Sequence, residues 1–343
     1  MNNSTDTPDS DDSDRRNQPD YMYVYLAAVD IVALTGLVGN IFLFFMMFRS
    51  ALKNVSFSVY LSYLAVIQSI VLLQTATEDT LDHGFFVLDE FLEPICRPWV
   101  LLMDTTRFAS TWLVLALTID RCIAIFFTKY KEAFCSRKVS HGICLSIISI
   151  CLLLSLPGNV TPRVQHDNST DHEEDDAPST CPNDYEVYRF VMSGVFHTLV
   201  PVLICCVLDV IILFKVKRAV QRVAVNPETP PEAVAVNVSQ AEKVKWCLVA
   251  LCCLAVVTLF PIAIIESIEN FSSDETAVEN AGEAWRFFNI VLLINYGQNF
   301  YIVIIMSLYM RCLFKQMLCG EKVRYKRPQE FDTILSASDN NFL

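Results

Sequence analysis

The stretch CRPWVLLMDTTRFASTWLVLALTIDR, which runs from Cys96 to Arg121, decides the fold. As a helix it rises about 37 Å, enough to cross a hydrocarbon core of about 30 Å. Five residues project from this helix within about 40° of one line along its surface: they are Met103, Arg107, Ser110, Val114 and Arg121. Two arginines and a hydroxyl therefore share one helical face. A charge at mid-bilayer costs about 2.5–3.5 kcal/mol even on a lenient insertion scale. We therefore expect this face to look into a helical bundle and not into lipid.

The composition also favours a membrane protein. Of the 343 residues, 53% are hydrophobic and only 19% are charged, proportions that few soluble domains have. Long apolar runs predict seven transmembrane spans, at 21–48, 55–77, 95–127, 139–159, 185–214, 244–268 and 284–309. An odd number of spans places the two termini on opposite sides of the membrane.

The charges of the loops predict the orientation. The positive-inside rule assigns to the cytoplasm the segments in which lysine and arginine gather, and these are 49–54, 128–138, 215–243 and the residues after Arg311. The amino-terminal tail and the other three loops hold most of the 38 acidic residues. We therefore expect a multi-pass protein of the plasma membrane with an extracellular amino terminus.

Four regions follow from this topology. We predict a disordered acidic tail over 1–20, because it is polar and lacks the apolar core of a signal peptide. The transmembrane domain occupies 21–309, an amphipathic helix at the membrane surface occupies 310–319, and a cytoplasmic tail occupies 320–343.

Cysteine usage agrees with this topology. Of the 13 cysteines, only Cys96 and Cys181 would face the oxidising side of the membrane. A bond between them would close a long loop and, by chain entropy, would stabilise the fold by up to about 4–5 kcal/mol, less any strain. Two free thiols are the alternative. The other cysteines lie in spans or inside, where a reduced, apolar-like thiol is the norm.

The joint spacing of these residues resembles the rhodopsin-like G-protein-coupled receptors over residues 21–319. The resemblance is carried by an asparagine, two cysteines, an Asp-Arg pair and two prolines, followed by an asparagine-rich last span, and the residues are Asn40, Cys96, Asp120, Arg121, Cys181, Pro201 and Pro261. It implies an all-α membrane protein, a seven-transmembrane helix bundle with a short amphipathic eighth helix. The apolar side of that helix would lie on the membrane and consists of Phe314, Met317 and Leu318.

Several family motifs are altered, which makes this chain a divergent member. The family's Asp-Arg-Tyr reads Asp120-Arg121-Cys122, and the buried aspartate of the second span is replaced by Gln68. The fourth span has no tryptophan. The remaining substitutions are Thr258-Leu259-Phe260-Pro261 for Cys-Trp-x-Pro in span six, Asp209 for the span-five tyrosine, and Phe300 and Val303 for the proline and tyrosine of span seven.

The resemblance also identifies a polar core. In the family a sodium ion lies among an aspartate, a serine and two asparagines. The matching residues here are Gln68, Ser110, Asn295 and Asn299, and Asn40 is adjacent to them. Because the carboxylate is missing, a hard cation loses its main ligand. We expect no metal or other cofactor, and a neutral network of amides and a hydroxyl that joins spans one, two, three and seven. General polar bonding between helices is the alternative interpretation.

Two further elements belong to the expected activation machinery. Pro261 removes a helical hydrogen bond and is expected to kink span six, with Pro201 as a second hinge in span five. The resemblance implies that Asp120 holds Arg121 in the silent state and that Arg121 receives the G protein when span six moves, in a two-state equilibrium. Asp209 is an alternative partner for Arg121, or for a lysine of a cytoplasmic loop.

Ligand-pocket candidates lie in the outer half of the bundle and are Met103, Asp104, Arg107 and Glu266. Asp104 and Arg107 are one helical turn apart, so they either neutralise each other or face the charged ends of a peptide. The acidic loops 161–184 and 269–283 would concentrate cations at the mouth, unless they are only solvated surface. A basic peptide is the favoured ligand and a basic chemokine-like protein the second, while lipid and odorant ligands stay open.

We therefore predict a cell-surface receptor that binds an extracellular ligand and activates a heterotrimeric G protein. Arrestin and the lipid bilayer are further partners, and nucleic acid is not one. No metal spacing, nucleophile elbow or phosphate loop indicates an enzyme. The altered motifs keep a second hypothesis open, a seven-span scavenging receptor that internalises ligand without G-protein signalling. We expect glycans on Asn3 and Asn168 and a palmitoyl group on Cys319.

The expected disulfide gives a first prediction. Cys96→Ala and Cys181→Ala should each reduce the amount of receptor at the cell surface. The double variant should lose no more than either single variant, because the same bond is lost in all three. Flow cytometry of cells that express an epitope-tagged receptor measures the loss, and additive losses would contradict the bond.

Overall fold

The computed structural model describes residues 20–49, 55–82, 89–160, 191–225, 254, 257–265, 267–268, 272, 275–306 and 308–319, and these form helices with short connections and no strand. The long helices are α2 (Asp20–Arg49), α3 (Ser56–Asp82), α4 (Asp89–Phe126), α6 (Arg137–Val160), α8 (Val200–Val225) and α10 (Glu275–Gly297). The shorter elements are η3 (Thr128–Tyr130), α5 (Lys131–Phe134), a π-helical segment η4 (Val191–Leu199), α11 (Asn299–Met306) and α12 (Leu308–Cys319).

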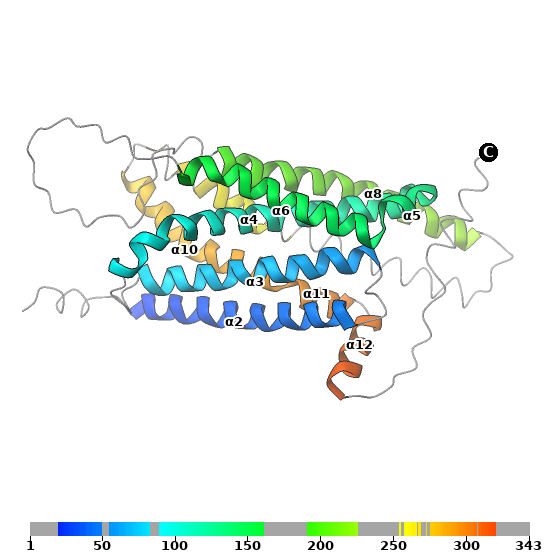
Figure 1. Ribbon diagram of the computed structural model, residues 1–343, viewed down its shortest axis with the longest axis horizontal. Coiled ribbons are helices and arrows are strands. Elements are labelled where there is room, and N and C mark those ends of the chain that lie inside the picture. Colours follow the sequence, from blue (N-terminus) through cyan, green and yellow to red (C-terminus); the bar gives the residue numbers. More distant parts are fainter. Residues whose placement is uncertain are drawn as a thin grey trace, which may run out of the picture.

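The long helices lie lengthwise in one bundle (Figure 1). Helix α4 packs against α3, α6, α8 and η4, and α2 packs against α3, α10 and α11. Helix α12 leaves the bundle at a steep angle after α11 (Figure 1). We name the two ends of the bundle by buried residues, the Tyr25 end and the Asp120 end.

The described residues of the predicted spans are helical except for Gln298 and two residues at span ends, Val55 and Phe127. Five helical stretches are long and apolar enough to cross a membrane, at Met22–Phe48, Ser56–Thr80, Arg97–Ala124, Arg137–Pro157 and Gly194–Phe214. The bent pair α10 and α11 would make a further span. Of the span predicted over 244–268, the structure describes only Leu254, 257–265 and 267–268, which are helical. An all-helical membrane bundle is therefore confirmed.

Two boundary predictions were wrong. Residues 269–283 were expected as a loop, but α10 already begins at Glu275. Glutamates suit the first turns of a helix, because its amino terminus carries a partial positive charge. The last span was expected as one helix over 284–309, but α10 and α11 meet at Gln298 with a bend of 56°. This break occurs without the family's proline.

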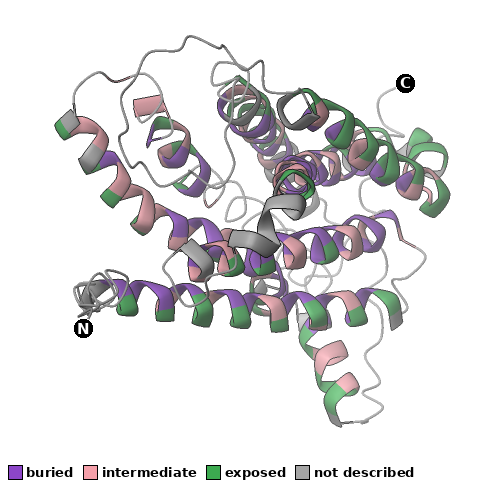
Figure 2. Cartoon of the chain, turned by 60° about the vertical axis from the view of Figure 1, so that its left-hand side comes forward, coloured by how far each residue is buried: buried purple, intermediate pink, exposed green. Residues whose placement is uncertain are grey.

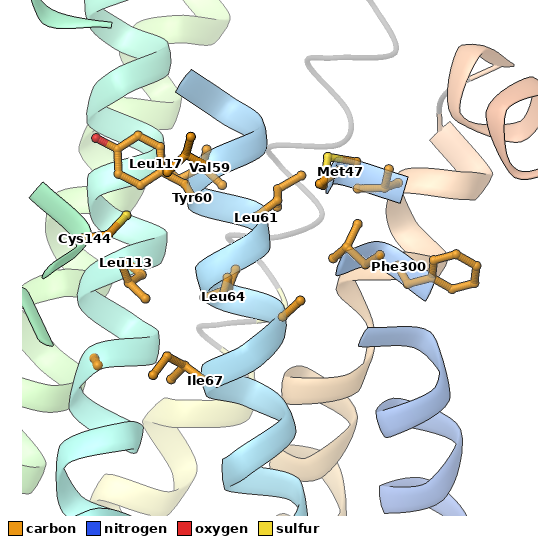
Figure 3. Close-up of a cluster of buried hydrophobic side chains, with 14 of the residues drawn as sticks. Met47, Val59, Tyr60, Leu61, Leu64, Ile67, Leu113, Leu117, Cys144 and Phe300 are labelled. Atoms are coloured by element: carbon orange, nitrogen blue, oxygen red, sulfur yellow. The ribbon is translucent and has the colours of Figure 1, made fainter. Parts of the chain in front are cut away.

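The core consists of two apolar clusters, one toward each end of the bundle. Toward the Asp120 end, side chains of α2, α3, α4, α6, α11 and α12 meet. Figure 3 shows several of them, among which are Met47, Tyr60, Leu64, Leu113, Cys144 and Phe300. Toward the Tyr25 end the cluster includes Met22, Val29, Leu72, Ile262 and Leu293. The outward faces are exposed (Figure 2) and apolar, as at Leu34, Phe45 and Leu153. Such faces suit lipid, which is as apolar as leucine.

Glycines on two helices bring the backbones of α2 and α10 into direct contact. A Cβ placed on Gly297 would lie 2.7 Å from the Gly36 Cα, and a Cβ on Gly36 would lie 2.9 Å from the Gly297 Cα and 2.8 Å from Leu72 Cδ1. Small residues permit this approach in membrane helices, where van der Waals packing replaces the hydrophobic effect. The break at Gln298 follows immediately after this contact.

The glycine contact gives a second prediction. Gly36→Ala and Gly297→Ala should each destabilise the bundle by about 1–3 kcal/mol, because a backbone must shift to accept the methyl group. Thermal melting of the purified receptor in detergent measures the effect. Gly142→Ala in α6 is the matched control, since a Cβ there meets nothing within 4 Å and should be neutral or stabilising. An equal melting temperature in all three variants would contradict the packing argument.

Candidate functional site

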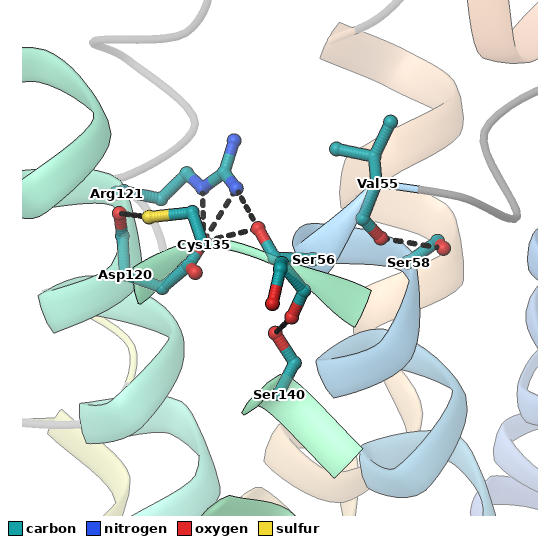
Figure 4. Close-up of polar contacts among 8 residues, drawn as sticks. Val55, Ser56, Ser58, Asp120, Arg121, Cys135 and Ser140 are labelled. Carbon is teal, nitrogen blue, oxygen red and sulfur yellow. Dashed lines mark hydrogen bonds and ion pairs between the residues drawn. The ribbon is translucent and has the colours of Figure 1, made fainter. Parts of the chain in front are cut away.

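An ion pair between Asp120 and Arg121 forms the first site, at the end of α4 (Figure 4). The Asp120 side chain is 3% exposed, whereas the Arg121 side chain is 25% exposed. Ser56, at the start of α3, bridges the pair: its Oγ donates to Asp120 Oδ2 at 2.9 Å and accepts from an Arg121 terminal nitrogen at 3.1 Å. Arg121 Nε donates to Asp120 Oδ2 at 3.1 Å. The guanidinium is thus held against α3 by an anion and a hydroxyl.

Neighbouring groups complete this clamp. The Arg121 guanidinium carbon lies 5.1 Å from the centre of the Phe57 ring, a cation–π contact. The thiol of Cys135 lies 3.6 Å from the Asp120 carbonyl oxygen. The predicted alternative, Arg121 on Asp209, is not adopted here, since the guanidinium contacts Asp120. Asp209 is buried on α8 at the side of Cys122, which is itself buried.

A polar layer crosses the middle of the bundle. Gln68 Nε2 donates to Ser110 Oγ at 3.3 Å, and Asn299 Nδ2 donates to Gln68 Oε1 at 2.6 Å. All three side chains are buried. The layer links α3, α4 and α11 through neutral groups, and on α3 it separates residues of the two apolar clusters.

The other two predicted core asparagines bond elsewhere. Asn40 Nδ2 donates to the backbone carbonyl of Tyr296 at 3.2 Å, and Asn295 Oδ1 accepts from Gln298 Nε2 at 2.8 Å. Because α10 ends at Gly297, its last carbonyls have no helical donor. Asn40 supplies one donor from α2, and α11 restarts with the Ile302 amide on the Gln298 carbonyl at 3.0 Å. The structure thus joins three of the five predicted residues in one network and uses Asn40 at the break.

The ligand candidates on α4 lie toward the Tyr25 end. Met103 is buried and Asp104 is half-buried. Among the described residues no ion pair joins Asp104 to Arg107. The predicted alternative in which these two charges neutralise each other is therefore not seen. Arg107 Nε is buried without a hydrogen-bond partner. Of Glu266 the structure describes nothing.

A second polar cluster at the Tyr25 end was not predicted. Tyr25 Oη donates to Asp79 Oδ1 at 3.2 Å, and Asn289 Nδ2 donates to both Tyr25 Oη at 2.9 Å and Asp79 Oδ2 at 3.0 Å. The three buried side chains come from α2, α3 and α10. One signal was present in the sequence: Asp79 follows Gln68 by eleven residues, so both lie on the same face of α3.

Comparison with known proteins decides the class. The model of the 7-transmembrane receptor (rhodopsin family) matches residues 39–299. The chain is a member of that family. As a rhodopsin-family receptor it is not an enzyme, and its helices belong to a seven-transmembrane bundle.

Individual relatives are more distant. The receptor is 24% identical to human cysteinyl leukotriene receptor 1 over 212 residues, which cover 61% of this chain and 60% of that one. It is 29% identical to the rat Mas-related G-protein coupled receptor member F over 134 residues, or 39% of this chain and 37% of that one. The matches thus span less than two thirds of these relatives.

At Pro201 the receptor compensates for a missing amide hydrogen with a side chain from another helix. Pro201 follows η4 and has no amide hydrogen to donate to the Phe196 carbonyl five residues earlier, the acceptor in a π-helix. Trp112 of α4 donates its indole Nε1–H to that carbonyl at 3.1 Å. Pro261 lies within the helical segment 257–265, and its role as a hinge stays a prediction.

Other predicted sites fall outside the described parts of the receptor. These are Cys181, Asn3 and Asn168, together with the side chains of Cys96 and Cys319, whose helices alone are described. The eighth helix was predicted over 310–319, where α12 runs from Leu308 to Cys319; its position on a membrane surface stays a prediction. The described residues form no cluster of His, Cys, Asp or Glu suited to a metal ion.

The polar layer gives a third prediction. Gln68→Leu removes both hydrogen bonds and leaves Ser110 and Asn299 buried without them, so it should destabilise the receptor by about 1–3 kcal/mol. The same change combined with Ser110→Ala should cost less than the sum of the two. Thermal melting in detergent measures both effects. Asn295→Leu is the control, since among the described residues the Asn295 side chain bonds to its neighbour Gln298 and not to the layer, and an equal loss in that variant would contradict the layer.

Proposed function

We propose that this receptor binds an extracellular ligand at the Tyr25 end and activates a heterotrimeric G protein at the Asp120 end. The observation that supports this most directly is the clamp on Arg121, formed by Asp120 and Ser56. Family membership adds the class of partner. In this proposal the amino terminus is extracellular, the receptor lies in the plasma membrane, and arrestin is a further partner.

The geometry suggests how the switch works. In the clamped form Arg121 is bound to an anion, a hydroxyl and an aromatic ring, so it is not available to a G protein. When the inner ends of the helices separate, the guanidinium can instead donate to a partner's backbone carbonyls. A charge-assisted hydrogen bond contributes about 1.5–3 kcal/mol, so its loss shifts a two-state ratio at least about tenfold.

A basic peptide is the ligand class that we propose first. The acidic outer segments 161–184 and 269–283 would attract a cationic ligand. Three glutamates of the second segment lie in the first turns of α10. At the same end the buried carboxylate of Asp79 receives hydrogen bonds from neutral groups of α2 and α10. The human relative is named for cysteinyl leukotrienes, which makes a lipid-derived ligand the second candidate class.

The fourth prediction tests the switch. Arg121→Ala should abolish agonist-driven nucleotide exchange while ligand binding and surface expression persist, because Arg121 lies about 25 Å from Asp104 by helical rise. Asp120→Asn and Ser56→Ala each weaken the clamp and should raise activity without ligand. Exchange assays on membranes with several purified G proteins, beside radioligand binding, separate the two properties.

Arg137→Ala is the control for this experiment, since Arg137 is an exposed arginine at the start of α6, outside the clamp. That variant should signal like the wild type. If cells take up ligand but no G protein responds to the wild type, to Arg121→Ala or to Asp120→Asn, the scavenging receptor is the correct function.

A further inference from the structure

Two buried nitrogen atoms without hydrogen-bond partners lie on facing elements, α4 and η4. They are Nε of Arg107 and Nε2 of His197. His197 is 7% exposed, and its ring lies close enough to Arg107 to interact with it electrostatically. Neither atom belongs to the clamp, to the polar layer or to the Asp79 cluster.

Three contacts fix the position of the His197 side chain. The His197 ring stacks on Phe108, with ring centres 5.3 Å apart and an angle of 29° between their planes. It is also within hydrogen-bonding reach of the Arg107 backbone. The Trp112 indole holds the Phe196 carbonyl, one residue before His197. The His197 ring is therefore preorganised beside the part of α4 that carries Arg107.

Unpartnered nitrogens in this place require an explanation. A buried polar group that lacks a hydrogen bond loses its hydration without compensation, and the loss is greater for a charged group. Asp104, one turn away on the same helix, forms no ion pair with Arg107 in the described structure. Arg107 lies in the middle part of α4, far from the polar ends of the span, and among the described residues its Nε–H has no acceptor.

We propose that Arg107 and His197 bind the carboxylate of the receptor's ligand. One carboxylate oxygen accepts the Arg107 Nε–H, and the other accepts a hydrogen bond from Nε2–H of a His197 ring that takes up a proton when the ligand binds. Charge-assisted bonds of this kind are the stronger hydrogen bonds of proteins. Phe108 and Met103, both buried beside the pair, favour an apolar group next to the carboxylate. This inference rests on the proposed ligand-binding role of the Tyr25 end.

Two kinds of ligand present such a group, a fatty-acid-like lipid and a peptide with an apolar, unamidated last residue. The test uses the purified full-length receptor in detergent and follows thermal melting with two pairs of probes. Octanoate and octanamide represent the lipid acid. N-acetylphenylalanine and its amide represent the peptide end. Ligands that bind only the folded state raise the melting temperature by mass action.

We expect at least one acid to stabilise the wild type while its amide does not. Arg107→Gln should weaken the apparent affinity for that acid about tenfold or more. His197→Phe, which keeps a ring to stack on Phe108, should weaken it as well. Arg107→Lys retains the charge and should retain part of the binding, which guards against misfolding of Arg107→Gln. Arg137→Gln, at an exposed arginine at the start of α6, is the matched control and should bind like the wild type.

Stabilisation by octanoate alone assigns a lipid acid and removes the basic peptide, whereas stabilisation by N-acetylphenylalanine alone assigns a peptide carboxy terminus. If neither acid stabilises the wild type, or if Arg107→Gln responds as the wild type does, the inference is overturned and the two nitrogens are hydrated. Because melting does not involve a G protein, a receptor that fails to signal would leave this result intact.

Discussion

The structure depends on one constraint, that irregular helical backbone inside an apolar bundle needs hydrogen-bond partners from neighbouring helices. Two irregularities show this. At Gln298 the last span breaks, and Asn40 of α2 donates to the buried Tyr296 carbonyl. At Pro201 an amide hydrogen is missing, and Trp112 of α4 donates to the Phe196 carbonyl. In both places a side chain from another helix supplies a hydrogen bond to a carbonyl at the irregularity, so the irregular backbone becomes part of the packing.

Helix α4 connects the features that this constraint produces. It carries Arg107 beside η4, Ser110 in the polar layer, and the Asp120–Arg121 pair. Helix α3 follows it with Gln68 in the layer and Ser56 in the clamp. A ligand that shifts α4 against α3 would therefore strain the layer and the clamp together. This coupling is a hypothesis, based on the contacts that join α3 and α4 along their length. The polar layer itself differs from the family's arrangement, because it has no carboxylate to hold a cation.

Much of this arrangement could be predicted from the sequence, for identifiable reasons. Long apolar runs fixed the helices, and the adjacency of Asp120 and Arg121 made their ion pair local. The Asp79 cluster was missed because its partners come from α2 and α10, which are distant in sequence. The break at Gln298 was missed because no proline marks it; the glycine contact with Gly36 and the capture of the Tyr296 carbonyl by Asn40 are tertiary effects. The start of α10 was missed because its glutamates suggest a loop unless the helix dipole is considered.

Buried charges at the Tyr25 end are distributed in a way that constrains any ligand. The Asp79 carboxylate lies where α2, α3 and α10 meet, whereas the Arg107 guanidinium lies between α4 and η4. An apolar ligand would leave the Arg107 Nε–H without an acceptor. A purely cationic ligand would suit the acidic segments but would place like charge near Arg107. A ligand that carries a carboxylate at one end and a cationic group further along it matches both sides, and a basic peptide with a free carboxy terminus has this pattern. The same physical rule, that buried charge needs a partner, thus connects the acidic exterior of the sequence with the arginine inside the bundle.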